Sequence, residues 1–213
     1  MNLVLEEAIE TNPDDLDYVY GFVRTYEDLI QVNLAYLDGR MKTTPVGEEI
    51  YEETLPFLDK LREINRLGFM SYYGSPVSWD EYGKEKSLIV GILPISCYDS
   101  FVEFIQTKVG VYCEIHHIKT GRRVFTNIPC YPYNLSVHFK NEVTHPLNVH
   151  DRFNPKKDFL ADYYKFPRIR KILDKCINIQ LVGTNYGYGN VEDPLLEYLN
   201  KCDICIGFDR KCG

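Results

Sequence analysis

The sequence contains no apolar run that approaches the roughly 20 residues needed by a membrane-spanning helix. Its N-terminal stretch, MNLVLEEAIETNPDD, is acidic and lacks the basic start of a secretory signal peptide. We therefore expect no membrane partner and a cytoplasmic location, in a host cell if the protein is viral. Internal repeats, low-complexity tracts and convincing linkers are also missing, so we expect one compact domain over residues 1–213.

Sequence motifs of well-known enzyme classes are missing too. There is no G-x-S-x-G elbow, no H-E-x-x-H helix, no H-x-E…C-x-x-C pattern and no P-loop. Hydrophobic residues make up 45% of the 213 residues, which is enough for a packed core and argues against wholesale disorder. An enzyme is therefore neither predicted nor excluded by these features.

The charge of the chain is unevenly distributed. Residues 1–100 carry 8 basic and 19 acidic side chains, whereas residues 101–213 carry 16 basic and 12 acidic ones. The formal net charge is −7, so the whole protein is not a generic binder of polyanions. An acidic N-terminal part and a more basic C-terminal part can nevertheless orient a charged partner as it approaches.

The pattern of apolar residues predicts an α+β fold in which β-hairpins and a mixed sheet pack against several helices. Helices are predicted from Asn12-Pro13 onward and at residues 54–67, 97–108, 154–165, 168–176 and 190–201. Strands are predicted at residues 87–95, 109–118, 123–128, 177–182 and 203–208, with a short one from residue 69 and a broken one at 129–139. Residues 29–46 are predicted to form a hairpin that turns at Asp38-Gly39.

All five histidines fall between residues 116 and 150, and an aspartate follows the last of them: His116, His117, His138, His145, His150 and Asp151. Imidazole is the commonest metal ligand and the usual general acid or base near neutral pH. If these side chains line one pocket, the protein is a hydrolase that acts on a nucleotide or a phosphate ester. The alternative is surface or hydrogen-bonded histidines, because no metal-ligand spacing is present. On a strand, His116 and His117 point to opposite faces.

The seven cysteines predict reduced thiols, since their number is odd. One C-x-x-C pair, Cys202 and Cys205, precedes Cys212 near the end of the chain. Zinc binding by these three residues is the alternative, but no second C-x-x-C pair follows. We therefore expect neither a metal nor a cofactor.

Basic and aromatic residues alternate between residues 152 and 175. Cations there could neutralise phosphates while exposed rings stack on bases. The residues that would contact a nucleic acid are Tyr163, Tyr164, Arg168, Arg170 and Lys171. The alternative is a pair of amphipathic helices whose aromatic residues pack inward and whose basic side chains are solvated.

The chain contains 17 tyrosines, several of them in segments bracketed by Gly and Pro. Tyrosine suits binding surfaces because its ring offers apolar area and its hydroxyl a polar tip. The favoured hypothesis is therefore a non-enzymatic binding or assembly protein that recognises a protein partner, or a second copy of itself, through Tyr-rich loops. The aromatic residues that would contact the partner in these segments are Tyr72, Tyr73, Trp79, Tyr186 and Tyr188.

Residues 58–93 contain a helix-ending pattern that continues into a Ser/Pro-containing loop. The matching residues are Leu61, Ile64, Asn65, Gly68, Phe69, Ser71, Pro76 and Gly91. In this pattern the chain resembles an uncharacterised group of small phage, bacterial and large-DNA-virus proteins, although Gly74-Ser75 stands where a Gln is more typical. The resemblance implies a helix–strand–loop–strand unit and makes a viral origin an expectation. It implies no activity and no functional residue.

Overall fold

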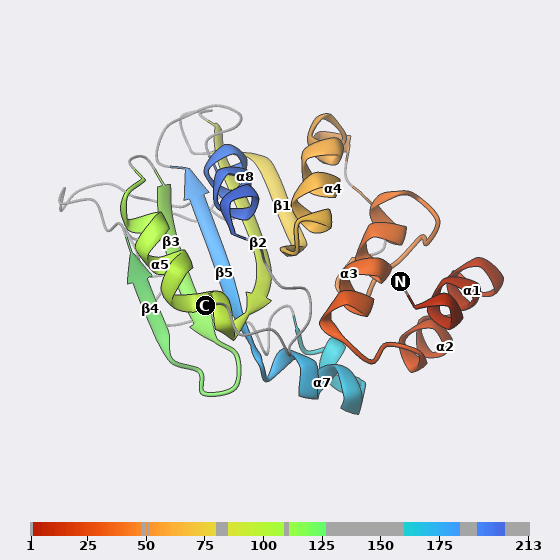
Figure 1. Cartoon of the computed structure of the whole chain (residues 1–213). Helices are drawn as coiled ribbons and strands as arrows, with labels where there is room; N and C mark the ends of the chain where they lie inside the picture. Colours follow the sequence, from red (N-terminus) through yellow and green to blue (C-terminus); the bar gives the residue numbers. More distant parts are fainter. Residues whose placement is uncertain are drawn as a thin grey trace.

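The structure is a computed structural model that describes residues 2–47, 50, 52–79, 85–108, 111–126, 160–183 and 191–202 (Figure 1). Its helices are α1 (Leu3–Thr11), α2 (Leu16–Gly21), α3 (Tyr26–Leu37), α4 (Leu58–Arg66), α5 (Tyr98–Gln106), α7 (Pro167–Leu173) and α8 (Glu192–Lys201). Shorter 3-10 helices are η1 (Glu52–Phe57), η2 (Ile95–Cys97) and η4 (Tyr163–Lys165). The strands are β1 (Met70–Trp79), β2 (Glu85–Pro94), β3 (Val111–His117), β4 (Arg123–Thr126) and β5 (Cys176–Gly183).

The described strands form one sheet in the order β1-β2-β5-β3-β4. All four strand pairs are antiparallel, so the predicted α+β class is confirmed, whereas the prediction of a mixed sheet is wrong for the described strands. Strands β2 and β3 both flank β5 and therefore run in the same direction, and α5 connects them over the sheet. This connection explains the error, because a helical crossover usually joins hydrogen-bonded parallel strands.

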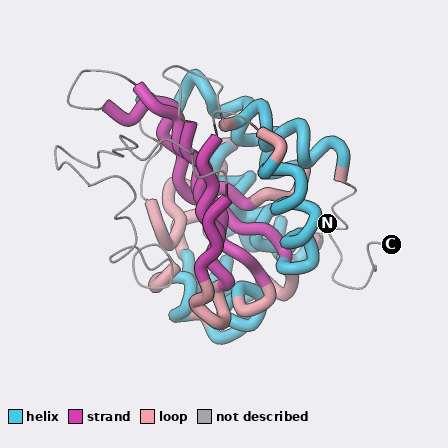
Figure 2. Tube along the Cα trace, turned by 90° about the vertical axis from the view of Figure 1, so that its left-hand side faces the viewer, coloured by secondary structure: helices cyan, strands magenta, loops and turns pink. Residues whose placement is uncertain are grey.

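The central strand β5 is buried along its whole length. One face of the sheet carries an apolar row on each inner strand, and this face packs against α4, α5 and α8. At one end of the opposite face, Met70, Ile92 and Cys176 pack against α1, α2, α3 and α7. Figure 2 shows the described helices to the right of the strands and below them.

The predicted hairpin at residues 29–46 is wrong, because the first half of this segment belongs to the helix α3. Thr25 and Asp28 form a capping box at its start, and Gly39, with a φ of 74°, ends it as a left-handed residue. The helix is buried on more than one side, since it packs against α1, α4 and β1. Burial on several sides hides the 3.6-residue period, which explains why the sequence resembled a strand.

Most other predicted elements are confirmed within the described residues. The helix predicted at 54–67 corresponds to η1 followed by α4, and those at 97–108, 168–176 and 190–201 correspond to α5, α7 and α8. The strands at 87–95, 109–118, 123–128 and 177–182 correspond to β2, β3, β4 and β5. The strand from residue 69 is longer than expected, and α1 was not predicted. Residues 129–139, 203–208 and 154–159 lie outside the described residues, and the end of the helix predicted at 154–165 is a turn followed by η4. That residues 1–213 form one domain stays a prediction.

Candidate functional site

Four polar side chains lie together on the inner strands of the sheet. Glu114 and His116 alternate along β3, and the strand register places Gln180 opposite Glu114 and Asn178 opposite His116 on β5. Residues that are paired across antiparallel strands point to the same side of the sheet. The four side chains, which we call the polar face, therefore occupy the side opposite to α4, α5 and α8.

The polar face is almost completely buried. The exposed fraction is 0% for Glu114, 2% for His116, 0% for Asn178 and 3% for Gln180. Leaving one buried polar group without a hydrogen bond lowers stability by about 1–3 kcal/mol. Because apolar residues at these positions would avoid that loss, the polar face is the strongest candidate for a functional site among the described residues.

The contacts of the polar face leave specific acceptors open. Nε2 of His116 lies 2.6 Å from Oε1 of Glu114. Nδ2 of Asn178 donates a hydrogen bond of 3.2 Å to the carbonyl oxygen of Gly91 and another to the hydroxyl of Tyr72. Oε2 of Glu114 and Oδ1 of Asn178 accept no hydrogen bond from any residue that the structure describes. The arrangement therefore matches a molecule that brings N–H or O–H donors.

Two tyrosines reach the edge of the polar face through an irregularity in β1. The register between β1 and β2 shifts between Ser71 and Tyr73, which makes Tyr72 the extra residue of a β-bulge. As a result Tyr72 and Tyr73 both pack against the apolar cluster that includes Val90. Burial raises the pKa of the Tyr72 hydroxyl well above its ordinary value, so this group stays neutral near pH 7.

The histidines that the sequence singled out are separated where they are described. His116 belongs to the polar face, whereas the ring of His117 packs against Tyr98 on the other side of the sheet, 4.7 Å between centroids. The prediction that the two point to opposite faces is confirmed. Burial, and then the charge of Arg122, lower the pKa of His117. The remaining members of the proposed cluster lie outside the described residues: His138, His145, His150 and Asp151.

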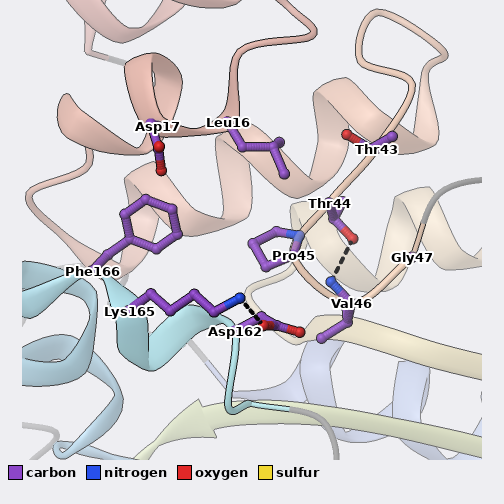
Figure 3. A pocket seen from close by; sticks show the side chains of 10 residues that line it. All are labelled: Leu16, Asp17, Thr43, Thr44, Pro45, Val46, Gly47, Asp162, Lys165 and Phe166. Carbon is purple, nitrogen blue, oxygen red and sulfur yellow. Dashed lines mark hydrogen bonds and ion pairs between the residues drawn. The ribbon is translucent and has the colours of Figure 1, made fainter.

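An open groove lies between α2, the loop at residues 43–47 and η4 (Figure 3). Its volume is about 770 Å³, and Lys165 and Asp162 both line it. Nζ of Lys165 lies 2.5 Å from Oδ1 of Asp162, and Asp17 lines the groove as well. The lysine charge is therefore already neutralised, and the groove offers no clear site for an anion.

The basic helix α7 combines features of both interpretations of residues 152–175. Arg168, Arg170 and Lys171 are exposed, and Arg170 lies over the ring of Tyr164 at 5.7 Å. The apolar residues of the same helix are buried, as expected for an amphipathic helix. Tyr163 is fully buried in the core, so the prediction that its ring is available to stack on a base is wrong.

The other predicted site residues lie largely outside the described part of the chain. Cys202 is half-buried, and Cys205 and Cys212 are not described. Among the described residues, no group of three His, Cys, Asp or Glu side chains could hold a metal ion. Tyr186, Tyr188 and the side chain of Trp79 are also not described. Binding through Tyr-rich loops therefore stays a prediction.

The residues behind the sequence resemblance have structural roles. Asn65, in α4, hydrogen-bonds both the backbone N–H and the hydroxyl of Ser71, which fixes the start of β1. Gly68 has a φ of 99°, which favours glycine. The ring of Phe69 lies so close to Gly91 that a Cβ there would sit 2.3 Å from Cε1. These positions explain the pattern without invoking a site.

The polar face as a whole was not predicted from the sequence, although a signal was present. The strands β3 and β5 read VYCEIHH and CINIQLVG, and each places two polar residues two positions apart in an apolar run. That spacing puts both polar residues on one side of a strand.

No family model matches the chain, and no significant match was found among curated proteins. Within the described residues, no helix has both the length and the apolar character needed to cross a bilayer.

Proposed function

We propose that this protein binds a small molecule rich in hydrogen-bond donors against the polar face of its sheet. The observation that carries the proposal is the contact between the buried Glu114 and His116, next to two buried acceptor atoms that no described residue satisfies. The ligand would supply donors to Oε2 of Glu114 and Oδ1 of Asn178.

A purely structural role explains the pair less well. Replacing a buried ion pair by apolar residues of similar volume is often neutral or stabilising, by about 1–4 kcal/mol. The neighbouring positions on the same side of the sheet, Val90 and Ile92, are apolar and equally buried. The fold thus accommodates apolar residues on this side of the sheet. The polar residues at 114 and 116 are therefore better explained by a role in recognition.

The chemistry of the polar face favours a neutral or cationic ligand. A carboxylate oxygen without a donor would repel a phosphate group placed beside it. A nucleotide or phosphate ester, which the histidines alone suggested, is therefore less well supported than an amidine, a guanidine or an amide. Such groups present more than one N–H donor, and each of the two open acceptors can take one of them.

The same pair gives the proposed site the means for proton transfer. A carboxylate in contact with an imidazole nitrogen is an arrangement used for general acid–base catalysis, in which the carboxylate orients the ring. An enzyme of this kind would use His116 to exchange a proton with the bound molecule and Glu114 to hold the ring. Binding is the part of this proposal that can be tested first.

The test is a titration of the ¹⁵N-labelled protein with acetamidine, followed by NMR. We expect shift changes at the His116 ring and the Asn178 side-chain amide, and at least about tenfold weaker binding by Glu114→Gln. The control Glu63→Gln removes the same charge from an exposed position on α4 and should bind like the wild type. Equal binding by Glu114→Gln, or no shift at these two residues, would contradict the proposal.

A second candidate is binding of a nucleic acid by α7. It is supported by the exposed cations at Arg168, Arg170 and Lys171 and by the half-buried ring of Tyr164 beneath Arg170. Affinity for a single-stranded oligonucleotide should then fall steeply as salt rises, and Arg170→Gln with Lys171→Gln should reduce the salt dependence. Affinity that is unchanged by salt rules this candidate out.

A further inference from the structure

A second, separate cavity lies beside the first strand of the sheet. Its volume is about 290 Å³, and its walls come from α3, η1, α4 and β1 and from the loop around residue 46. Three tyrosines line it, Tyr36, Tyr72 and Tyr73, together with apolar side chains such as Leu61. This volume is close to the lower end of the range of small-ligand pockets, about 300–1,000 Å³.

A much smaller cavity of about 10 Å³ lies beside the tyrosine-lined one, and a buried carboxyl group is part of its wall. It shares Thr54, Leu61 and Gly74 with the tyrosine-lined cavity and is also lined by Glu192, the first residue of α8. Glu192 is only 3% exposed. Its Oε2 atom accepts no hydrogen bond from any part of the chain that the structure describes.

Among the described residues, none forms an ion pair with Glu192, although the charge of Lys60 acts to lower its pKa. Lys60 makes its ion pair with the exposed Asp193 instead, 2.7 Å from Nζ to Oδ1. Burial raises the pKa of Glu192, and backbone N–H groups at the start of α8 offset this effect only in part. A helix N-terminus accounts for an acidic residue at this position but not for the second, unsatisfied oxygen.

We infer that this cavity binds a small molecule with an aromatic or apolar body and one amino group. The body would lie among Tyr36, Tyr72 and Tyr73, where stacking and cation–π contacts are available. The ammonium group would enter the smaller cavity, whose volume is that of about one water-sized group, and pair with Glu192. This inference does not rest on the polar face, because the carboxyl group involved lies on a different element.

The inference is tested by calorimetry with tyramine, which has a phenol ring and one amine, and with 4-ethylphenol, which lacks the amine. We expect the wild type to bind tyramine more tightly than 4-ethylphenol. Glu192→Gln should weaken tyramine binding at least about tenfold and leave 4-ethylphenol binding unchanged. Glu63→Gln removes the same charge from an exposed position on α4 and should bind both compounds like the wild type.

A second variant tests the cavity itself. A Cβ at Gly74 would meet the Leu61 methyl groups at 3.6 and 3.8 Å, an ordinary contact, so Gly74→Val should fold and occupy ligand space. It should abolish binding of both compounds. The inference is overturned if the wild type binds no tyramine at about millimolar concentration, or if either Glu192→Gln or Gly74→Val binds tyramine as tightly as the wild type. Glu114→Gln should not change tyramine binding, so the two proposals can fail separately.

Discussion

Nδ2 of Asn33 lies 2.8 Å from Oδ1 of Asn65, and this hydrogen bond joins α3 to the end of α4 inside the protein. Asn33 also donates to the carbonyl oxygen of Ser71, and Asn65 accepts from the Ser71 N–H. Two buried amides thus connect two helices and the start of β1. Because β1 lines the tyrosine-lined cavity and carries Tyr72, which contacts Asn178, this network positions residues of that cavity and one contact of the polar face.

The first prediction concerns this network. Asn65→Leu removes the bonds to Asn33 and Ser71 and leaves their buried groups without partners, so we expect the free energy of unfolding to fall by about 2–4 kcal/mol. Denaturant unfolding measures the change. Glu63→Ala, at an exposed position of the same helix, should change it by less than about 0.5 kcal/mol. A small effect of Asn65→Leu would show that the network is not what fixes β1.

The second prediction compares two glycines. A Cβ at Gly91 would lie 2.3 Å from Cε1 of Phe69 and 2.4 Å from the carbonyl oxygen of Met70, so Gly91→Ala should destabilise the protein by about 3 kcal/mol or more. A Cβ at Gly21 meets nothing within 4 Å, and this residue is helical. Gly21→Ala should therefore be neutral or stabilising by up to about 1 kcal/mol. The melting temperatures of the two variants measure this difference. Similar values would contradict the close packing of Phe69 and Met70 against Gly91.

The third prediction follows from the raised pKa of Glu192. The unfolded chain loses this proton near the ordinary pKa of 4.5, before the folded protein does. The contribution of Glu192 to the free energy of unfolding is therefore fully present below that pH. It is lost as pH rises through the pKa that Glu192 has in the folded protein. Glu192→Gln should remove this loss. Its stability relative to the wild type should increase from about pH 4 to pH 8, and a constant difference would be inconsistent with burial of the carboxyl group.

The fourth prediction separates a functional from a structural role of the polar face. The double variant Glu114→Met, His116→Leu replaces the pair with apolar side chains and should be as stable as the wild type or more stable. Glu114→Met alone leaves His116 without its carboxylate and should be less stable than the double variant. Chemical denaturation of the three proteins gives the comparison. A double variant that is several kcal/mol less stable than the wild type would mean that the pair holds the fold together.

Sequence patterns predicted the elements whose periodicity is uniform. The apolar stripe with Leu61 and Ile64 indicated α4, because this helix buries one face. The continuous apolar run at 87–95 indicated β2, because this strand is buried on both faces. The pattern failed at α3, where burial on several sides of the helix removed the helical period. Capping by Thr25 and Asp28 was the available signal for a helix there.

The candidate sites were less accessible to sequence reasoning. His116 was singled out, but its partner Glu114 and the opposite residues Asn178 and Gln180 come together only through the register of β3 and β5. β3 lies beside β5 because α5 carries the chain from β2 past β5, and no local sequence pattern indicates this crossover. The tyrosines at 72 and 73 were expected in a loop, whereas a bulge places them in a strand beside a cavity.

The most direct measurement for the central claim is a crystal structure of the protein soaked with acetamidine. The account predicts the amidinium group on the polar face, with its nitrogen atoms within about 3.2 Å of Oε2 of Glu114 and Oδ1 of Asn178. Crystals of Glu114→Gln under the same conditions should show much weaker occupancy. Acetamidine bound elsewhere, or a polar face that stays without it at saturating concentration, would contradict the claim that this face binds a ligand.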